Sequence, residues 1–268
     1  MNDRLTDLDF ADDIALLAEN NLQCQQMTQQ LKAESAKIGL RINLTKTKIL
    51  KLGLQPVQPI MIDQVPLEEV HNFTYLGSTM TDSGSIDLDI RSRLGKARAT
   101  FQRLNKIWKT KNVTLQIKLQ LYMSIVVTTA IYACETWKST KGIAKQLDVF
   151  HQRNLRRILG ISWRDHVTNQ EVLERTNQKP LHQIVAERRW KLAGHIHRLP
   201  EDRPAKQALH WKPATGSRKR GRPKITWQST FNSDLKERNI TPVTVPALAQ
   251  DRVRWRQLAA RCQDDRRT

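Results

Sequence analysis

The sequence predicts an α+β protein that is mainly α-helical, with a small β-hairpin or sheet followed by a helical bundle and a basic extended region. Short apolar runs flank the polar pair Asp12-Asp13, as they do at the tip of a hairpin. From Ser85 onward, apolar residues recur at helical spacing in segments separated by short breaks. The expected domains are residues 1–80 (hairpin and sheet), 81–198 (helical) and 199–268 (a Pro/Gly-rich basic arm with short helices).

The carboxylate pair is the first candidate site. Successive strand residues point to opposite faces, so a hairpin tip can direct one aspartate into a site and leave the other beside it. Two adjacent carboxylates repel unless a cation compensates, and Mg²⁺ (or Mn²⁺) prefers such oxygen ligands. An EF-hand loop is excluded because the required Gly and closing Glu are missing. A plain surface turn is the alternative for an isolated Asp-Asp pair.

The remaining N-terminal elements follow from capping and turn residues. Asn20 or Asn21 can cap a helix that Gly39 ends in a left-handed conformation. Alternating apolar residues over 40–44 predict a strand directly after it. Several prolines among short apolar runs predict edge strands and turns over residues 51–70.

An amphipathic helix is expected from Ile86 to Trp108, with apolar residues on one face for six turns. Its opposite face carries Arg91, Arg93, Lys96, Arg98, Arg103, Lys106 and Lys109. Because so few acidic residues are interspersed, this face suits phosphate binding better than an ordinary solvated surface does. Further helices are expected from Thr114 to Trp137, around Ile143–Ile158, after a capping box at Thr168 and Glu171, over Leu181–Arg198, and around Trp227–Leu235 and Leu248–Cys262.

The charge is large and unevenly distributed. The net charge is +19, from 45 Lys and Arg against 26 Asp and Glu; residues 1–70 carry −3 and the remainder +22. An acidic start that holds a carboxylate pair, joined to a basic body, suits a metal site next to a polyanion-binding surface. Polyanionic nucleic acid is therefore the expected partner.

Targeting and cysteine patterns exclude several classes. The polar, charged N-terminus does not resemble a signal peptide. No apolar run reaches the ~18 residues of a membrane span, so no membrane partner is expected. Three widely separated cysteines support neither a zinc site nor a disulfide framework, and the His195-Ile196-His197 segment lacks a third ligand nearby. We expect a reduced intracellular location, nuclear or cytoplasmic.

Three segments, LDFADDIALLAEN, GLRINLTKTKIL and FTYLGS, resemble in order and spacing the C-terminal part of the reverse transcriptase of a non-LTR (LINE-type) retrotransposon. The resemblance continues through YACETW, RRILGISWRDHVTN, RRWKLAGHIHR and KRGRPKITW, so it covers nearly the whole chain. It implies an RNA-directed DNA polymerase, which transfers nucleotides from dNTPs to a primer 3′-OH on an RNA template with two metal ions. It implies an RNA template, a DNA primer and target DNA as partners.

The resemblance also implies residue roles. Asp12 and Asp13 stand in the metal-binding box, and Lys46 lies in a motif near the incoming nucleotide. Residues 73–78 match the primer grip, which gives nucleic-acid contact to Tyr75 and Gly77; the helix after Ser85 matches the start of the thumb. The implied contacts on that helix and on a basic, AT-hook-like arm are Arg91, Arg98, Lys106, Arg218, Arg220 and Arg222. Generic nucleic-acid contact is the alternative for the arm.

One departure from the family pattern separates two functional hypotheses. The family has a further metal-binding Asp on a strand upstream of the FADD box, whereas this sequence begins about ten residues before Asp12. In the first hypothesis the chain is a polymerase fragment that is inactive alone. In the second it is a nucleic-acid-binding remnant without catalysis.

Overall fold

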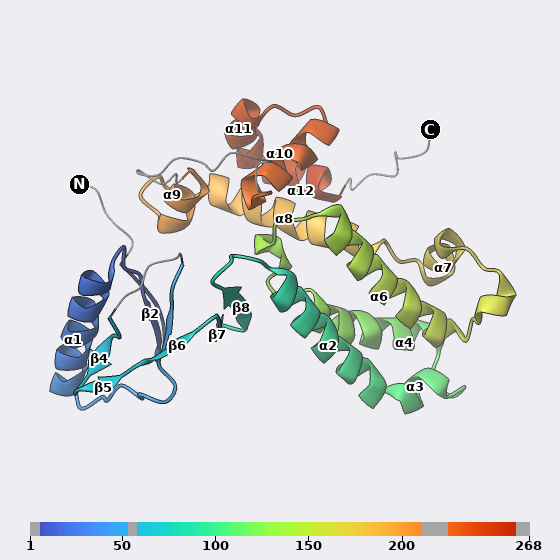
Figure 1. Ribbon diagram of the computed structural model, residues 1–268. Helices are drawn as coiled ribbons and strands as arrows, with labels where there is room; N and C mark the ends of the chain where they lie inside the picture. Colours follow the sequence, from blue (N-terminus) through green and yellow to red (C-terminus); the bar gives the residue numbers. More distant parts are fainter. Residues whose placement is uncertain (1–5, 53–57, 211–224, 261–268) are drawn as a thin grey trace. The chain divides into compact units, whose positions relative to one another are not determined.

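The computed structural model describes residues 6–52, 58–210 and 225–260. The chain forms two compact units, unit 1 (Met1–Asp89) and unit 2 (Ile90–Thr268). Unit 1 combines one long helix with two-stranded sheets, and unit 2 is helical (Figure 1). The expected class, α+β and mainly α, is confirmed.

Unit 1 contains four two-stranded sheets within its described residues. Three are antiparallel hairpins, and the fourth pairs β3 with β6 in parallel. The strands are β1 (Asp7–Phe10) with β2 (Asp13–Leu16), β3 (Lys48–Leu50) with β6 (Glu68–Val70), β4 (Met61–Ile62) with β5 (Val65–Pro66), and β7 (Asn72–Tyr75) with β8 (Ser78–Thr81).

The helix of unit 1, α1 (Asn21–Lys37), begins and ends as its sequence predicts. The side chain of Asn20 accepts a hydrogen bond from the backbone N–H of Gln23 at 2.9 Å. Gly39 follows the helix with φ of +78°, a left-handed conformation that glycine adopts without steric cost. Nearby lies a small core of Ile60, Ile62 and Leu67, against which Cys24, Ile42, Leu44 and Ile49 pack.

The strand expected over residues 40–44 is wrong. The side-chain oxygen of Asn43 accepts hydrogen bonds from the backbone N–H groups of Thr45 and Lys46, both at 3.1 Å. An asparagine that satisfies following backbone donors in this way favours a turn over a strand. The strand therefore starts later, as β3, although Ile42 and Leu44 still contact the small core.

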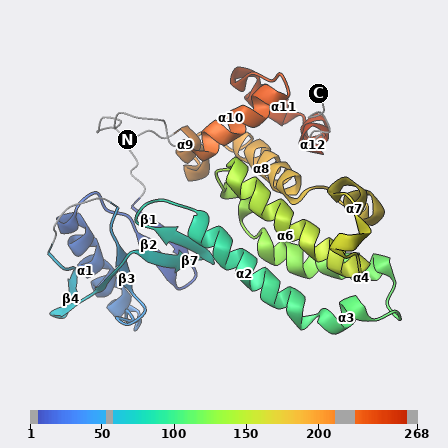
Figure 2. The same cartoon turned by 45° about the vertical axis from the view of Figure 1, so that its right-hand side comes forward.

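The helices of unit 2 pack in two groups (Figures 1 and 2). In one, α6 packs against α4, α7 and α8; in the other, α10, α11 and α12 contact α8. The helices of the chain beyond β8 are α2 (Asp87–Arg103), α3 (Asn105–Lys109), α4 (Leu115–Leu121), η1 (Tyr122–Val127, a π-helix), α5 (Thr128–Ala130), η2 (Cys134–Thr136), α6 (Lys141–Leu159), η3 (Trp163–Asp165), α7 (Asn169–Thr176), α8 (Leu181–His197), α9 (Pro204–His210), α10 (Trp227–Glu237), η4 (Pro242–Thr244), α11 (Val245–Gln250) and α12 (Arg252–Ala260).

Three expected helices are shorter or broken. The helix expected from Ile86 to Trp108 breaks at Leu104, between α2 and α3. The indole N–H of Trp108 donates to the Phe101 carbonyl at 2.8 Å, so it competes with backbone N–H groups for this acceptor. The helix that Thr114 caps passes through η1 and ends at Ala130, before the expected Trp137.

The C-terminal helix expected around Leu248–Cys262 is divided at Asp251. The Asp251 carboxylate accepts from the N–H groups of Val253 and Arg254 at 3.0 and 2.9 Å, which is how a carboxylate caps the start of a new helix. At Thr168 the predicted cap forms through the N–H of Glu171, but the Glu171 side chain pairs with Arg175 instead of returning to the cap.

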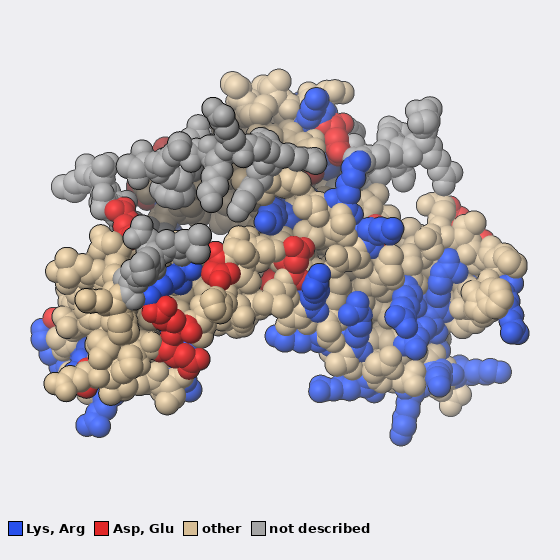
Figure 3. Space-filling model, in the orientation of Figure 1, with Lys and Arg blue, Asp and Glu red and all other residues tan. Residues whose placement is uncertain are grey.

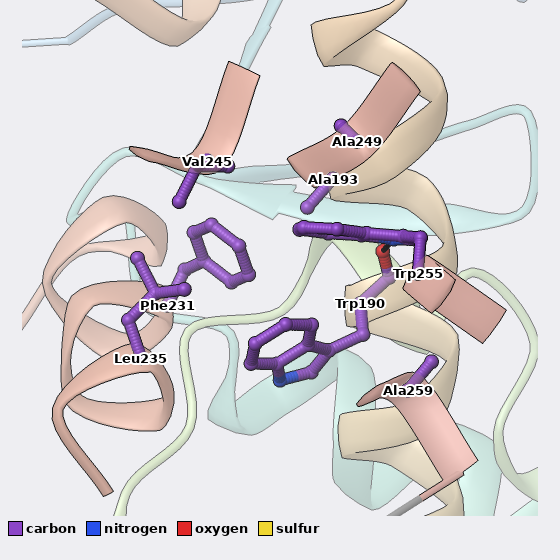
Figure 4. Close-up of a cluster of buried hydrophobic side chains, with 8 residues drawn as sticks. All are labelled: Trp190, Ala193, Phe231, Leu235, Val245, Ala249, Trp255 and Ala259. Carbon is purple, nitrogen blue, oxygen red and sulfur yellow. Dashed lines mark hydrogen bonds between the residues drawn. The ribbon is translucent and has the colours of Figure 1, made fainter. Parts of the chain in front are cut away.

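A cluster of buried aromatic and aliphatic side chains forms a core over α8 in unit 2 (Figure 4). The ring of Trp190 lies 5.3 Å from that of Phe231 and 5.1 Å from that of Trp255, between centroids. The indole N–H of Trp255 donates to the Trp190 carbonyl at 2.8 Å. A Cβ atom on Gly194 would lie 2.1 Å from this indole nitrogen, so glycine is needed for the close approach. Trp255 is therefore a buried anchor of this core.

No helix in the described part of the chain is long and apolar enough to cross a membrane.

Candidate metal site and nucleic-acid surface

The carboxylate pair lies at the tip of the predicted hairpin. In the β1–β2 register, Phe10 faces Asp13, so Ala11 and Asp12 form the turn and Asp13 opens β2. Ala11 has φ of +55°, a conformation that costs an L-residue about 1 kcal/mol or more. Both aspartates are exposed. Two carboxylates are thus presented side by side to solvent on a tight turn.

The donor set at this turn is limited to those two residues. Among residues 6–52, 58–210 and 225–260, no three His, Cys, Asp or Glu side chains are grouped to hold a metal ion. Mg²⁺ takes one or two protein carboxylates and completes its octahedron with water and phosphate oxygens. Asp12 and Asp13 therefore fit weak binding of one such ion, but they do not complete a pair of ion sites.

Tyr75 connects the tip hairpin to a second hairpin. Its hydroxyl donates to the carbonyl oxygen of Leu8 at 3.0 Å and approaches that of Asp13 at 3.4 Å. Leu8 lies on β1 and Asp13 on β2, so one side chain from β7 contacts both strands that carry the turn. The hydroxyl of Tyr75 faces the protein, which leaves the half-buried ring for any ligand.

Gly77 is the second residue after β7 and lies in the turn that leads to β8. Leu76 and Gly77 connect β7 and β8 with φ of +47° and +78°. Two consecutive residues with positive φ are typical of the turns that match the twist of a hairpin. This backbone requirement explains the glycine without any ligand.

The lysines after the Asn43 turn differ in their partners. Lys48 pairs with Glu68 and Lys51 with Glu69. Lys46 is exposed, and no ion pair forms at its ammonium within the described residues. Of the three, Lys46 is the cation left available to a phosphate.

A dense basic surface occupies the first helices of unit 2. From Ile90 to Cys134 the chain has nine Lys and Arg residues and no Asp or Glu. Figure 3 shows Lys and Arg gathered on this part of the molecule with few acidic side chains among them. Seven of the nine are exposed and form what we call the basic face: Arg91, Lys96, Arg98, Arg103, Lys106, Lys109 and Lys111.

Two cations of this stretch are not on the surface. Arg93, expected on the outer side of the helix, is 5% exposed, and its guanidinium lies 4.9 Å from the centroid of the Tyr132 ring. The distant Tyr132 provides a cation–π contact that the helical periodicity does not reveal. Lys118 donates to the carbonyls of Trp108 and Thr110 at 2.9 and 2.7 Å, which satisfies the end of α3. The predicted contacts Arg91, Arg98 and Lys106 all belong to the exposed set.

A buried polar pair was not predicted from the sequence. The hydroxyl of Tyr122 and Nδ1 of His151 are 2.9 Å apart in the core between η1 and α6. Burial lowers the pKa of His151 to about 4, although the carboxylate of Asp148 acts in the opposite direction. The spacing of apolar residues in α6 predicts that residue 151 faces inward, but it does not predict that Tyr122 is its hydrogen-bond partner.

The arm residues Arg218, Arg220 and Arg222 lie outside the described residues. His195 is exposed and His197 is buried at the end of α8, so the two histidines do not face a common site.

Comparison with known proteins gives one informative relative. The chain is 28% identical over 266 residues to a Caenorhabditis elegans protein that is provisionally named an uncharacterized transposon-derived protein. The match covers 94% of each sequence. No protein-family model matches the chain, and no solved structure does. The similarity indicates that this chain originates from a transposable element.

Proposed function

We propose that the chain contributes the Asp12–Asp13 hairpin and a basic nucleic-acid surface to the reverse transcriptase of a non-LTR retrotransposon. The supporting observation is the hydrogen bond from Tyr75 to the strands of the tip hairpin. The resemblance assigns the FADD box to metal binding and the FTYLGS segment to the primer. These segments are more than 60 residues apart, and Tyr75 joins them.

The role of the hairpin is to hold metal-bound phosphates. When bound, a pair of divalent ions in such a site stabilises the attacking and leaving oxygens of nucleotidyl transfer. Asp12 and Asp13 hold one part of that ligand set. Lys46 is exposed and forms no ion pair with the described residues, so its charge suits the phosphates of an incoming nucleotide or of leaving pyrophosphate.

The role of the basic face is to bind the template–primer through its phosphates. Seven exposed cations without an intervening acid provide sequence-independent affinity, which is what an enzyme that copies any template requires. A transposon origin fits such an activity.

The chain as it stands binds nucleic acid without extending a primer. Transfer with two ions about 4 Å apart needs carboxylates from more than one strand pair, and the described residues offer them from one hairpin only. A further carboxylate from outside the described residues is required for catalysis. The second candidate function is nucleic-acid binding without catalysis. It is favoured by the same observation, that the described residues offer metal-binding carboxylates from one hairpin only.

Two assays on the purified chain test this proposal. Binding to a labelled RNA–DNA hybrid is titrated against salt, and extension of its primer is measured with Mg²⁺ and with Mn²⁺. We expect binding that weakens with a slope of about 0.9 in log K per neutralised phosphate, and no extension. The matched variants are Asp12→Asn and Asp9→Asn, which remove one charge each from the same exposed hairpin.

The outcomes separate the two functions. Extension that Asp12→Asn abolishes and Asp9→Asn preserves would show a complete polymerase site and refute the expected inactivity. Binding that is indifferent to salt would contradict the electrostatic surface.

A further inference from the structure

Trp163 differs from the other tryptophans that the structure describes. Its exposed fraction is 80%, whereas Trp108, Trp137 and Trp255 are each 3% exposed. It lies in η3, in the loop between α6 and α7. The exposed indole is therefore not explained by packing within the fold.

The loop that carries Trp163 is held rigidly. Ser162 and Asp165 form a capping box, in which the Ser162 N–H donates to the Asp165 carboxylate at 2.6 Å. Arg156 donates from Nη2 to the Val167 carbonyl at 2.8 Å and to the Asn169 side chain at 2.9 Å. Both ends of the loop are thus fixed, and the indole is presented in a preorganised position at little cost in conformational entropy on binding.

The surroundings of Trp163 are cationic. The guanidinium of Arg164 lies 5.5 Å from the centroid of the indole ring, and Arg153 and Arg157 are exposed on the last turns of α6. Between residues 149 and 164 the chain has four arginines and no acidic residue. The first acid, Asp165, is engaged in the capping box.

We propose that Trp163 stacks on an unpaired base of a single-stranded nucleic acid, with Arg153, Arg157 and Arg164 on the adjacent phosphates. This inference rests on the proposed nucleic-acid-binding function and adds to it a second contact, which the basic face does not include. Bases present a π-face to an aromatic side chain only when they are unstacked, so the site selects single strands over duplex. The guanidinium of Arg164 lies over one face of the indole in a cation–π contact, so the base stacks on the other face.

Charge favours a nucleic acid over a protein partner. Recognition of a protein would require apolar neighbours around the indole, whereas Ile161 and Val167 are partly buried and the exposed neighbours are polar or charged. The combination of arginines with one aromatic ring is complementary to a phosphate backbone that carries bases.

The test compares Trp163→Ala with wild type on three labelled ligands: a short mixed-sequence single strand, the same strand with abasic sites throughout, and a duplex. Val243→Ala is the control, because Val243 is 87% exposed and lies in the same unit, outside this loop. We expect Trp163→Ala to lose roughly tenfold in affinity for the normal single strand. Its affinity for the abasic strand and the duplex should equal that of wild type, and its salt dependence should not change because no charge is removed.

Each other outcome contradicts the inference. Equal loss on all three ligands would indicate a general defect, and no loss on the normal strand would exclude stacking. Sedimentation is measured as well, on wild type and on Trp163→Ala. A dimeric wild type and a monomeric Trp163→Ala would assign the indole to self-association. If wild type binds no nucleic acid, the proposed function fails as well; if it binds with the expected salt slope but is indifferent to position 163, only this inference fails.

Discussion

The two units of the molecule are stabilised by different interactions. Unit 1 presents the carboxylate turn on a hairpin whose apolar side chains are largely open to solvent; Phe10, next to the turn, is 63% exposed. Unit 2 buries aromatic rings in its core, whereas the seven cations of the basic face stay exposed. Burial of apolar surface, the largest stabilising contribution in folding, is therefore concentrated in unit 2.

The difference shows how each unit holds its functional residues. In unit 2, the apolar faces of the helices are packed, and the seven cations of the basic face lie on the exposed side. In unit 1, hydrogen bonds such as that of Tyr75 hold the tip hairpin, and each contributes about 1 kcal/mol. The candidate metal site is thus on the less stabilised part of the molecule, where local opening is easier.

The largest expected effect tests the core of unit 2. Trp190→Ala removes a fully buried ring that contacts Phe231 and Trp255. We expect it to lower the free energy of unfolding of unit 2 by about 3–5 kcal/mol, as measured by urea denaturation followed by far-UV circular dichroism. Amide exchange in the β1–β2 hairpin should stay at the wild-type rate. A loss below 1 kcal/mol would mean that this core is not what stabilises the helices.

A second effect depends on pH and on the buried polar pair. Because burial lowers the pKa of His151 to about 4, from about 6.5 in the unfolded chain, the folded state favours neutral imidazole. The unfolded state binds the proton first, so stability is present above pH 6.5 and is lost as the pH falls towards 4. The loss attributable to this residue should be about 3 kcal/mol by pH 4.

His151→Gln isolates this contribution. Between pH 7 and pH 4 its stability should fall less than that of wild type, whereas the matched change at the exposed His195 should leave the wild-type pH profile intact. Identical profiles for wild type and His151→Gln would show that His151 does not set the acid sensitivity.

A smaller effect tests the hydrogen bond from Tyr75 that holds the tip hairpin in unit 1. Tyr75→Phe removes the hydroxyl that bonds to Leu8 and approaches Asp13, and keeps the ring. We expect the hairpin to open more readily by about 1 kcal/mol, seen as faster amide exchange in β1 and β2, while the core of unit 2 is unchanged. Tyr132→Phe is the control, because its ring lies against Arg93 in unit 2. Exchange that is equally slow in Tyr75→Phe would show that the hydroxyl does not hold the hairpin.

The smallest effect leaves stability unchanged and concerns metal binding. Asp12 and Asp13 should bind Mn²⁺ or Mg²⁺ weakly, with a roughly millimolar dissociation constant, because water fills most of the octahedron. Asp12→Ala should abolish the Mn²⁺-induced broadening of amide signals around the turn, and Asp9→Asn should preserve it. Broadening that persists in Asp12→Ala would place the ion elsewhere.

Sequence alone determined the features that depend on neighbours along the chain. The caps at Asn20, Thr114 and Thr168 each involve a backbone N–H three residues later, so side-chain chemistry and spacing are sufficient to predict them. The tip hairpin and the exposed cations of α2 follow from alternation and helical periodicity. The Asn43 turn is equally local, although the apolar alternation around it predicts a strand.

The tertiary structure decided what depends on residues far apart in sequence. The hydroxyl of Tyr75 meets the backbone of Leu8, 67 residues away, a contact that no local pattern predicts. Arg93 has the same spacing as its exposed neighbours, yet it is buried against Tyr132. Trp163 and Trp255 both stand among arginines in the sequence, and one is 80% exposed while the other is buried against Gly194. Periodicity tells which residues share a face, whereas exposure depends on which distant element covers that face.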